Sequence, residues 1–293
     1  MRIATSLNVF LNRCEPEAGI PRLAAAGFDG LDFNFCDLLE QPWHDGPAAD
    51  RWLEKLAAAA SKAGMSWVQA HGPMFNMFSA EAPNPARMAL VEPCLRACGR
   101  LGVPWMVHHP DVFAGPFDAA HRMAVRERNA AYFRALLPAC EKHGVGIAIE
   151  NIFDSAASGR GCPRFYGAVP DELCELIDAI DHPLVGACWD TGHARLMGLE
   201  QRTALSTLGK RLKVVHVQEN DGKGDDHMLP FANGRGGVDW EAVTAGMRAA
   251  GFAHAWTFEV ARAFQTVPEE LFDAQLRWAV DVARHLIARV ERG

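Results

Sequence analysis

The chain has 293 residues, of which 49% are hydrophobic and 22% are charged, and its formal net charge is −7. This composition excludes disordered and fibrous proteins, and one α/β barrel of about 250 residues accounts for most of the length. The acidic balance provides no overall attraction for nucleic acid, so we do not expect a nucleic-acid partner. The net charge of the whole chain does not exclude a local basic patch on its surface.

The first seven residues read as a short strand-like segment with no long apolar stretch behind it. They predict neither a secretory signal nor a membrane span, and we therefore expect a cytoplasmic location. The eight cysteines are scattered and form no Cys-x-x-Cys pair. This spacing favours reduced, buried thiols over disulfides or a cysteine metal site.

Eight short β-rich runs alternate with longer helical segments, such as residues 48–63 and 118–143. The alternation is typical of a parallel sheet with crossover helices, and glycines near the helix ends, such as Gly144, suit left-handed caps. We therefore expect an α/β protein, a (β/α)8 TIM barrel that forms a single domain over residues 1–293. The predicted strands are residues 2–7, 30–35, 66–71, 105–109, 145–150, 184–189, 213–217 and 255–259.

Two long segments without periodicity, residues 151–168 and 219–238, directly follow predicted strands. In such a barrel the loops after the strands carry the chemistry, so both segments are candidate active-site loops. Arg235, between glycines in the second loop, could reach a phosphate or carboxylate of a substrate, and a solvated loop arginine is an equal alternative. Asp239 is expected to cap the next helix.

Six consecutive predicted strands end in a histidine or a carboxylate. Each residue alone has an ordinary explanation, because a lone histidine at a strand end is more often a hydrogen-bonded core residue than a ligand. The combination of these residues does not have such an ordinary explanation, because buried carboxylates are costly unless they are paired or coordinated. No Lys or Arg stands at the neighbouring strand ends to pair with them. The pattern therefore calls for a cation. The residues are His71, His108, His109, Glu150, Asp190, His193, His216 and Glu259.

Four of these residues, Glu150, Asp190, His216 and Glu259, form a hard ligand set of mixed oxygen and nitrogen donors. Such a set suits Mn²⁺, Mg²⁺, Co²⁺ or Zn²⁺ and does not decide between them. A divalent metal is the expected cofactor.

The motifs around these residues resemble the xylose-isomerase-like TIM-barrel superfamily, which contains sugar isomerases, ketose 3-epimerases, inosose dehydratases and endonuclease IV enzymes. The matching motifs are Ile149-Glu150-Asn151, Cys188-Trp189-Asp190-Thr191-Gly192-His193-Ala194, Val215-His216-Val217 and Phe258-Glu259-Val260. They fall on strands five to eight in the expected order. The resemblance is specific for the superfamily and leaves the reaction open.

In epimerase-like members, the residues that match Glu150, Asp190, His216 and Glu259 hold one divalent metal, and the two glutamates also face the substrate carbon. The resemblance therefore implies Glu150 and Glu259 as acid and base, in no preferred order. It implies that His193 binds a substrate oxygen. A metal that spans a carbonyl and a hydroxyl oxygen would stabilise an enediolate during proton transfer.

The endonuclease IV branch holds three zinc ions and uses further residues. These match His71, His109 and His193 together with an Asp-x-His pair, which Asp225 and His227 supply here. All nine ligand positions can thus be assigned, and three metals would suit hydrolysis of a phosphate ester.

We interpret the sequence as a divalent-metal-dependent isomerase or epimerase of a sugar, keto-sugar or polyol-derived small molecule. A trinuclear-zinc phosphodiesterase of the endonuclease IV kind is the alternative, which the acidic charge disfavours. In the first interpretation His71 and His109 contact substrate or support the ligands, and Asp225 and His227 are additional metal ligands only if further ions bind. A catalytically inactive metal- or sugar-binding barrel is a third class. Homo-oligomerisation is an expectation from the superfamily.

Overall fold

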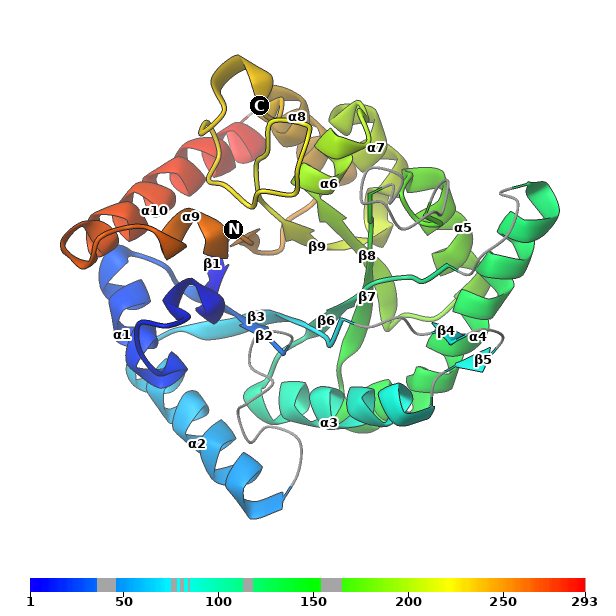
Figure 1. The fold of residues 1–293 in the computed structure, drawn as a ribbon, viewed down its shortest axis with the longest axis horizontal. Helices are drawn as coiled ribbons and strands as arrows, with labels where there is room; N and C mark the ends of the chain where they lie inside the picture. Colours follow the sequence, from blue (N-terminus) through cyan, green and yellow to red (C-terminus); the bar gives the residue numbers. More distant parts are fainter. Residues whose placement is uncertain are drawn as a thin grey trace.

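Eight parallel strands form one sheet with the order β10-β1-β2-β3-β6-β7-β8-β9, and a bridge between Val217 and Phe258 brings its two edges together. The protein is therefore a (β/α)8 TIM barrel, seen along its axis in Figure 1. The computed structural model describes residues 1–35, 46–74, 78–79, 82–83, 85–112, 118–153 and 165–292. The barrel strands are β1 (Ile3–Ser6), β2 (Gly30–Asn34), β3 (Ser66–His71), β6 (Trp105–His108), β7 (Gly146–Glu150), β8 (Val185–Asp190), β9 (Leu212–His216) and β10 (Trp256–Phe258).

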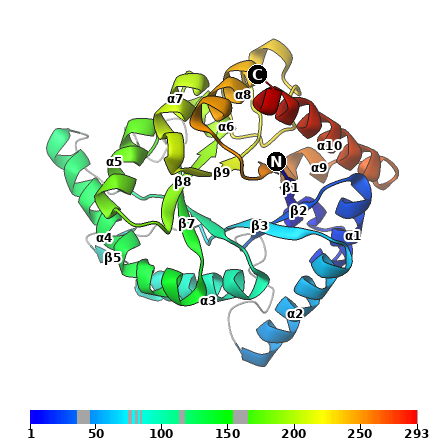
Figure 2. The same ribbon diagram turned by 180° about the vertical axis from the view of Figure 1, so that it is seen from behind.

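The helices surround the barrel as an outer ring, which is visible from both ends in Figures 1 and 2. They are α1 (Pro16–Ala26), α2 (Gly46–Lys62), α3 (Pro85–Leu101), α4 (Ala119–His143), α5 (Pro170–Ile180), α6 (Thr191–Leu196), α7 (Gln201–Leu208), α8 (Trp240–Ala250), α9 (Ala261–Gln265) and α10 (Glu269–Arg292). A short antiparallel ribbon of β4 (Phe78–Ser79) and β5 (Ala82–Pro83) was not expected from the sequence.

All eight predicted strands are confirmed, with each end within one residue of the expected position. The strands are recognisable because they are buried on both faces, as in β7 and β8, whose residues are all buried. Such strands read as continuous apolar runs. The predicted glycine cap is also confirmed at Gly144, which ends α4 with a φ of 68°. Asp239 caps α8 as expected.

The register of the sheet staggers the polar ends of neighbouring strands by no more than two residues. Glu150 pairs with Cys188 across β7 and β8, and Asp190 pairs with His216 across β8 and β9. Because all strands are parallel, their carboxyl ends meet at one mouth of the barrel, where the side chains of these residues gather.

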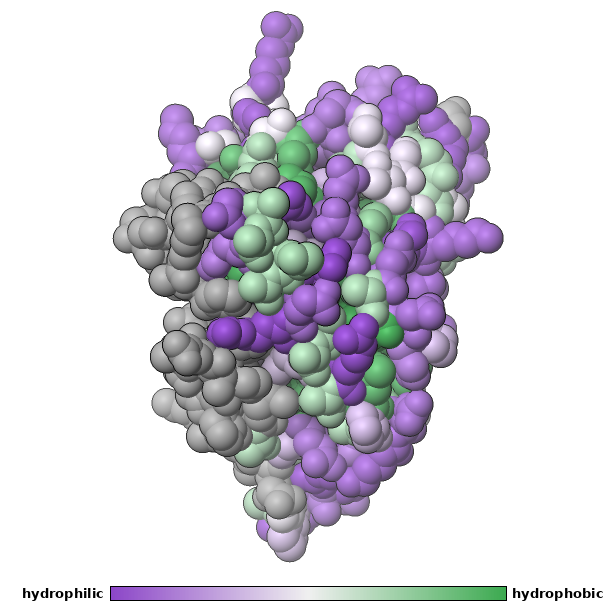
Figure 3. Space-filling model, turned by 90° about the vertical axis from the view of Figure 1, so that its right-hand side faces the viewer, coloured by the Kyte–Doolittle hydropathy of each residue, from purple (hydrophilic) through white to green (hydrophobic). Residues whose placement is uncertain are grey.

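Hydrophilic side chains cover most of the described surface on the side shown in Figure 3, with small groups of hydrophobic residues between them. None of the described helices is long and apolar enough to cross a membrane. Six cysteines in the described part of the chain are free; four of them are buried, as expected, whereas Cys14 and Cys174 are half-buried.

Removal of the α8 cap gives a direct test of the local stability of this fold. The Asp239 carboxylate accepts hydrogen bonds from the backbone N–H groups of Glu241 at 3.1 Å and Ala242 at 3.0 Å. We expect Asp239→Ala to lower the free energy of unfolding by about 1 kcal/mol in urea titration, because two N–H groups lose their acceptor. Asp239→Ser, which keeps a capping oxygen, should lose much less; equal losses in both variants would contradict the role of the cap.

Candidate metal centre

Glu150 is the central residue of a cluster at the carboxyl end of the barrel. Its side chain is buried at the end of β7, and both of its oxygens meet histidines. Oε1 lies 3.0 Å from His216 Nδ1, whereas Oε2 lies 3.0 Å from His109 Nε2 and 3.4 Å from His71 Nε2. A carboxylate in this position can bridge two neighbouring ligand groups.

The first ligand group consists of Glu150, Asp190, His216 and Glu259, whose donor atoms all lie within 4.8 Å of one another. Glu259, after β10, reaches the same His216 Nδ1 atom from the other side, at 3.1 Å from its Oε2. The group unites the four residues expected to hold one divalent ion. Three carboxylates and one imidazole fit a divalent cation such as Mn²⁺, Mg²⁺, Co²⁺ or Zn²⁺.

Two further groups flank the first one. His71, from β3, and His109, after β6, gather with Glu150, and their rings lie 5.1 Å apart. On the other side, His193 gathers with Asp225 and His227. The Asp225 Oδ2 atom lies 2.8 Å from His227 Nε2 and 3.6 Å from His193 Nε2. The structure thus brings together all nine positions considered from the sequence.

Three of the histidines are oriented by the backbone. The Nδ1–H groups of His71, His193 and His227 donate to the carbonyl oxygens of Gly72 at 2.8 Å, Asn151 at 2.8 Å and Glu259 at 2.9 Å. A carbonyl only accepts, so Nδ1 carries the proton and Nε2 faces the carboxylates. Metal-binding histidines are typically held in this way. The arrangement therefore fits metal ions in the flanking groups as well as in the first.

Carboxylates and imidazoles compensate one another's charge in this cluster. Burial alone would raise the pKa of Glu150, but His216 and His109 outweigh burial and lower it well below 4.5. The same balance, with His216 and His227 as the partners, lowers the pKa of Glu259 to about 2. Burial raises the pKa of Asp190 to about 7, against the attraction of His193. Among the described residues, every side chain that forms an ion pair with these three acids is a histidine.

Amide side chains that the sequence analysis missed hold the ligands in place. Asn151 accepts from the Asp190 N–H at 2.6 Å and donates to the Asp190 carbonyl at 3.0 Å. Gln218 donates to Asp190 Oδ1 at 3.2 Å and to Asp225 Oδ1 at 2.7 Å, which links the first group to the Asp225 group. A Cβ atom at Gly192 would lie 2.1 Å from the Gln218 side chain, so this glycine is required for the close approach.

Glu219 organises the loop that carries Asp225 and His227, a role that no sequence pattern indicates. Its buried carboxylate accepts from the backbone N–H groups of Phe231 at 2.8 Å and Asn233 at 2.6 Å, and from Trp240 Nε1 at 2.7 Å. These bonds tie the loop to the start of α8.

Other residues named in the sequence analysis lie away from the ligand groups. His108 receives a hydrogen bond from the Tyr132 hydroxyl at 2.9 Å, and burial together with His109 lowers its pKa to about 3, so it is a neutral core residue. Arg235 is exposed in a short 3-10 helix, and no hydrogen bond or ion pair among the described residues joins it to the cluster. Its substrate contact stays a prediction. Most of the 151–168 loop lies outside the described residues.

Asp32 is a further buried acid that the sequence analysis did not single out. It lies in β2 inside the barrel, is 1% exposed, and its Oδ1 atom has no hydrogen-bond partner among the described residues. Burial raises its pKa to about 7, with His216 opposing and Glu259 adding to the shift.

The raised pKa of Asp32 predicts how stability depends on pH. Below about pH 4 the acid is neutral in both folded and unfolded chains, so its ionisation costs nothing. Between about pH 4 and 7 Asp32 ionises only in the unfolded chain, so the free energy of unfolding falls as the pH rises. Above about pH 7 this loss of stability stays constant. Asp32→Asn should therefore stabilise the chelator-treated protein at pH 8, with a gain that shrinks to nothing near pH 4. A gain independent of pH in thermal unfolding would contradict this assignment.

Metal binding should release protons at pH 7. Burial disfavours the charged form of His227, but the Asp225 and Glu259 carboxylates outweigh it and raise its pKa to about 9. Burial also opposes protonation of His193, and Asp190 and Asp225 raise its pKa well above 6.5. A metal ligand must be a neutral imidazole, so ions and protons compete.

Isothermal titration of the chelator-treated protein with Zn²⁺ or Mn²⁺, in two buffers of different ionisation enthalpy, measures this release. The apparent affinity should rise from pH 6 to pH 9, because fewer protons must leave as His227 approaches its pKa. Equal heats in both buffers would refute the competition, and titration with K⁺ is the control for ionic strength.

Comparison with known proteins places this geometry in a family. Residues 20–282 match the family described as xylose isomerase-like TIM barrel. A probable endonuclease 4 from Methanoculleus marisnigri is 31% identical over 189 residues, which cover 57% of this chain and 60% of that protein. The chain spans about half to two thirds of the length of the curated relatives that it matches.

Solved structures agree over nearly the whole chain. A D-tagatose 3-epimerase-like protein matches with a TM-score of 0.75 at 15% identity, covering 99% of this chain and 98% of its own. The IOLI protein with a bound zinc atom matches with a TM-score of 0.74 at 16% identity, with coverage of 99% and 98%. At this identity the likeness shows the fold. Because the family model matches residues 20–282 and the eight parallel strands form the expected barrel, the chain belongs to the xylose isomerase-like TIM barrel family.

Proposed function

We propose that this protein is a divalent-metal-dependent isomerase or epimerase of a small, hydroxyl-rich substrate of the sugar or keto-polyol class. The observation that carries the proposal is the approach of two buried glutamates, Glu150 and Glu259, to one imidazole nitrogen from different sides of the barrel mouth. Two carboxylates around one ligand group suit removal of a proton from a carbon and its return.

The metal would be held by Glu150, Asp190, His216 and Glu259, as the donor set and its spacing allow. When bound there, a divalent ion polarises neighbouring carbonyl and hydroxyl oxygens and stabilises the negative charge of an enediolate. The likeness in fold to sugar epimerases supports a reaction of this type.

The two glutamates differ in their surroundings, which suggests a division of work. The Glu259 side chain is 12% exposed, whereas that of Glu150 is 1% exposed. Among the described residues no hydrogen bond reaches Glu259 Oε1, while both oxygens of Glu150 face histidines. Glu259 is therefore better placed to take the first proton from a substrate in the mouth, and Glu150 is better placed to return one through its contacts with His71 and His109.

His193 supports this reaction as a substrate contact. Its ring is fixed by Asn151 and lies against Phe153, with 4.9 Å between the ring centroids. Its Nε2 atom can bind a hydroxyl or carbonyl oxygen if no ion occupies the Asp225 group. Phe153 would add an apolar wall for the carbon face of a sugar.

A second candidate function is hydrolysis of a phosphate ester by a centre of up to three metals. The observation that favours it is the pair of flanking groups, His71 and His109 with Glu150, and His193 with Asp225 and His227, in which three imidazoles are held by backbone carbonyls. Several neighbouring cations suit attack on a phosphoester and stabilisation of its leaving oxygen. The probable endonuclease 4 among the relatives is consistent with this chemistry.

Metal content separates the two candidates. The isomerase proposal expects one tightly held Mn²⁺, Mg²⁺, Co²⁺ or Zn²⁺ per chain, whereas about three zinc ions per chain would favour the hydrolase. Purified protein should be analysed by mass spectrometry for metals after dialysis. Cleavage of a phosphodiester with no deuterium exchange in any ketose would overturn the first proposal.

Replacement of one catalytic glutamate tests the proton transfer directly. We expect Glu150→Gln to lower turnover by about 10² to 10⁴, because the amide cannot carry the proton, while circular dichroism stays unchanged. Incorporation of solvent deuterium into candidate ketoses, followed by NMR, measures the reaction. Glu270→Gln, at an exposed position of α10, is the matched control and should retain full activity. Full activity of the Glu150 variant would refute its role.

A further inference from the structure

The thiol of Cys188 lies beneath the candidate metal centre, and the proposed reaction does not use it. Cys188 and Asp190 are two residues apart on β8, so both side chains point to the same side of the strand, the inside of the barrel. Cys188 is the deeper of the two. Its register partners are Glu150 on β7 and Val214 on β9. The side chain is fully buried, so its sulfur contacts only groups inside the barrel.

The sulfur is within ligand reach of two residues of the metal centre. The donor atoms of Glu150, Cys188 and His216 all lie within 4.8 Å of one another, and all three side chains are buried. Burial raises the pKa of the Cys188 thiol, and His216 opposes this shift by its charge and by a side-chain hydrogen bond, so sulfur and imidazole are in contact. A carboxylate, a thiol and an imidazole at this spacing can hold one ion between them.

Cys188 differs from two other cysteines in the partner of its sulfur. The thiols of Cys94 and Cys174 donate to backbone carbonyl oxygens, at 3.1 Å and 3.6 Å. In the part of the chain that the structure describes, Cys188 has no backbone acceptor of this kind. Its sulfur faces the ionisable side chains of the metal centre instead, which is the position of a ligand.

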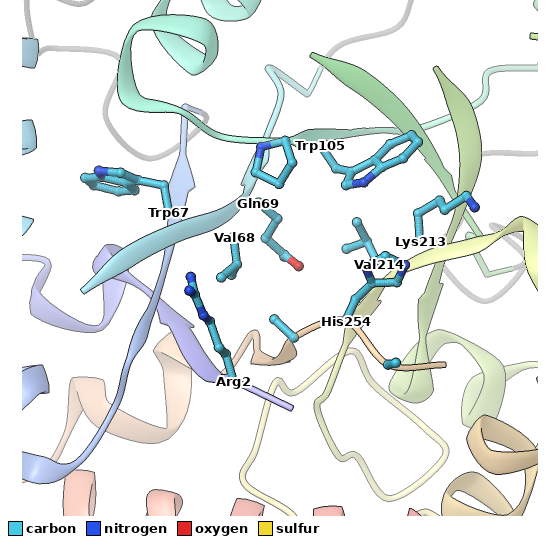
Figure 4. A pocket seen from close by; sticks show the side chains of 11 residues that line it. Arg2, Trp67, Val68, Gln69, Trp105, Lys213, Val214 and His254 are labelled. Atoms are coloured by element: carbon cyan, nitrogen blue, oxygen red, sulfur yellow. The ribbon is translucent and has the colours of Figure 1, made fainter. Parts of the chain in front are cut away.

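An apolar layer closes the site on its inner side. Cys188 packs with Val107, Ala148 and Val214 across the inside of the barrel. Figure 4 shows the hollow at the opposite end of the barrel, and Val214 is one of the residues in its wall. Because this layer separates the sulfur from the hollow, an ion approaches the sulfur from the mouth, through the candidate metal centre.

We propose that Glu150, Cys188 and His216 form a second position for an ion, which lies deeper in the barrel and selects soft divalent cations such as Cd²⁺. Thiolate sulfur favours soft ions, whereas carboxylate oxygen favours Mn²⁺ or Mg²⁺. Asp190 and Glu259 belong only to the outer position, and Cys188 belongs only to the inner one. As the bond between sulfur and metal forms, the thiol releases its proton to the solvent.

The two positions share Glu150 and His216, so ions in them compete. A soft ion in the inner position would engage the Glu150 carboxylate and leave Asp190 and Glu259 without their ion. Cys188 would thus make the centre sensitive to soft metals. The inference rests on the proposed function only through the two shared residues, and its failure would leave the outer position and its reaction untouched.

Ultraviolet absorption detects a bond between sulfur and cadmium without reference to activity. In a titration of the chelator-treated full chain with Cd²⁺, we expect a thiolate-to-cadmium band that saturates at about one ion per chain. Cys188→Ala should abolish this band and weaken Cd²⁺ binding by about tenfold or more. Cys140→Ala, which removes another buried thiol from α4, is the matched control and should retain the band. A band of equal size in Cys188→Ala and in the unmodified chain would overturn the proposal.

Manganese separates the two positions. Mn²⁺ binding, followed by electron paramagnetic resonance, should be unchanged in Cys188→Ala. It should weaken by about tenfold or more in Asp190→Asn, which should still give the cadmium band. Loss of this band in Asp190→Asn as complete as in Cys188→Ala would show a single shared position and refute the assignment. Failure of Mn²⁺ to bind the unmodified chain would contradict the proposed function, while the cadmium band would still support the inner position.

Thermal unfolding shows whether the variants fold. Cys188→Ser, which is close to cysteine in size, replaces Cys188→Ala in both measurements if the alanine variant does not fold. A hydroxyl group gives no thiolate-to-cadmium band, so the expected loss is the same, and a band retained by the serine variant would overturn the proposal equally.

Discussion

The burial of several carboxylates among imidazoles at one mouth of the barrel is the constraint on which the site depends. Glu150, Asp190 and Glu259 lie in a region where an unpaired charge costs several kcal/mol. Histidines are their ion-pair partners in the described chain, and a histidine compensates a carboxylate only while it is protonated. The cluster therefore balances its charge with protons, and metal ions bound there would compete with those protons.

The barrel supplies the geometry that makes this balance possible. Backbone carbonyls of Gly72, Asn151 and Glu259, all next to strand ends, fix three imidazole rings. The direction of each ring is thus set by the main chain at the barrel mouth and not by the flexible side chains of loops. Ligands held by rigid elements need little reorganisation when an ion binds, which favours tight and selective binding.

The fold and the polar residues at the barrel mouth could be predicted because both leave local signals. Strands buried on both faces read as apolar runs that glycines separate from helices, and Glu150 or His216 stands out as a polar residue at the end of such a run. The individual contacts, such as the approach of Glu150 and Glu259 to the same nitrogen of His216, could not be predicted, because they depend on side-chain directions. Gln218 and Glu219 look like ordinary loop residues, Asp32 looks like any polar residue in a strand, and Arg235 lies on an exposed turn.

Glu150 is the residue at which the two candidate reactions diverge. If a single ion were held by Asp190, His216 and Glu259 together with Glu150 Oε1, the Oε2 atom beside His109 would remain able to exchange a proton with a substrate. If His71 and His109 also held an ion, both oxygens of Glu150 would face cations, and such a carboxylate would be too weak a base for proton transfer. Under the two proposed functions, the affinity of this histidine pair for an ion would therefore decide whether the cluster moves protons or activates water.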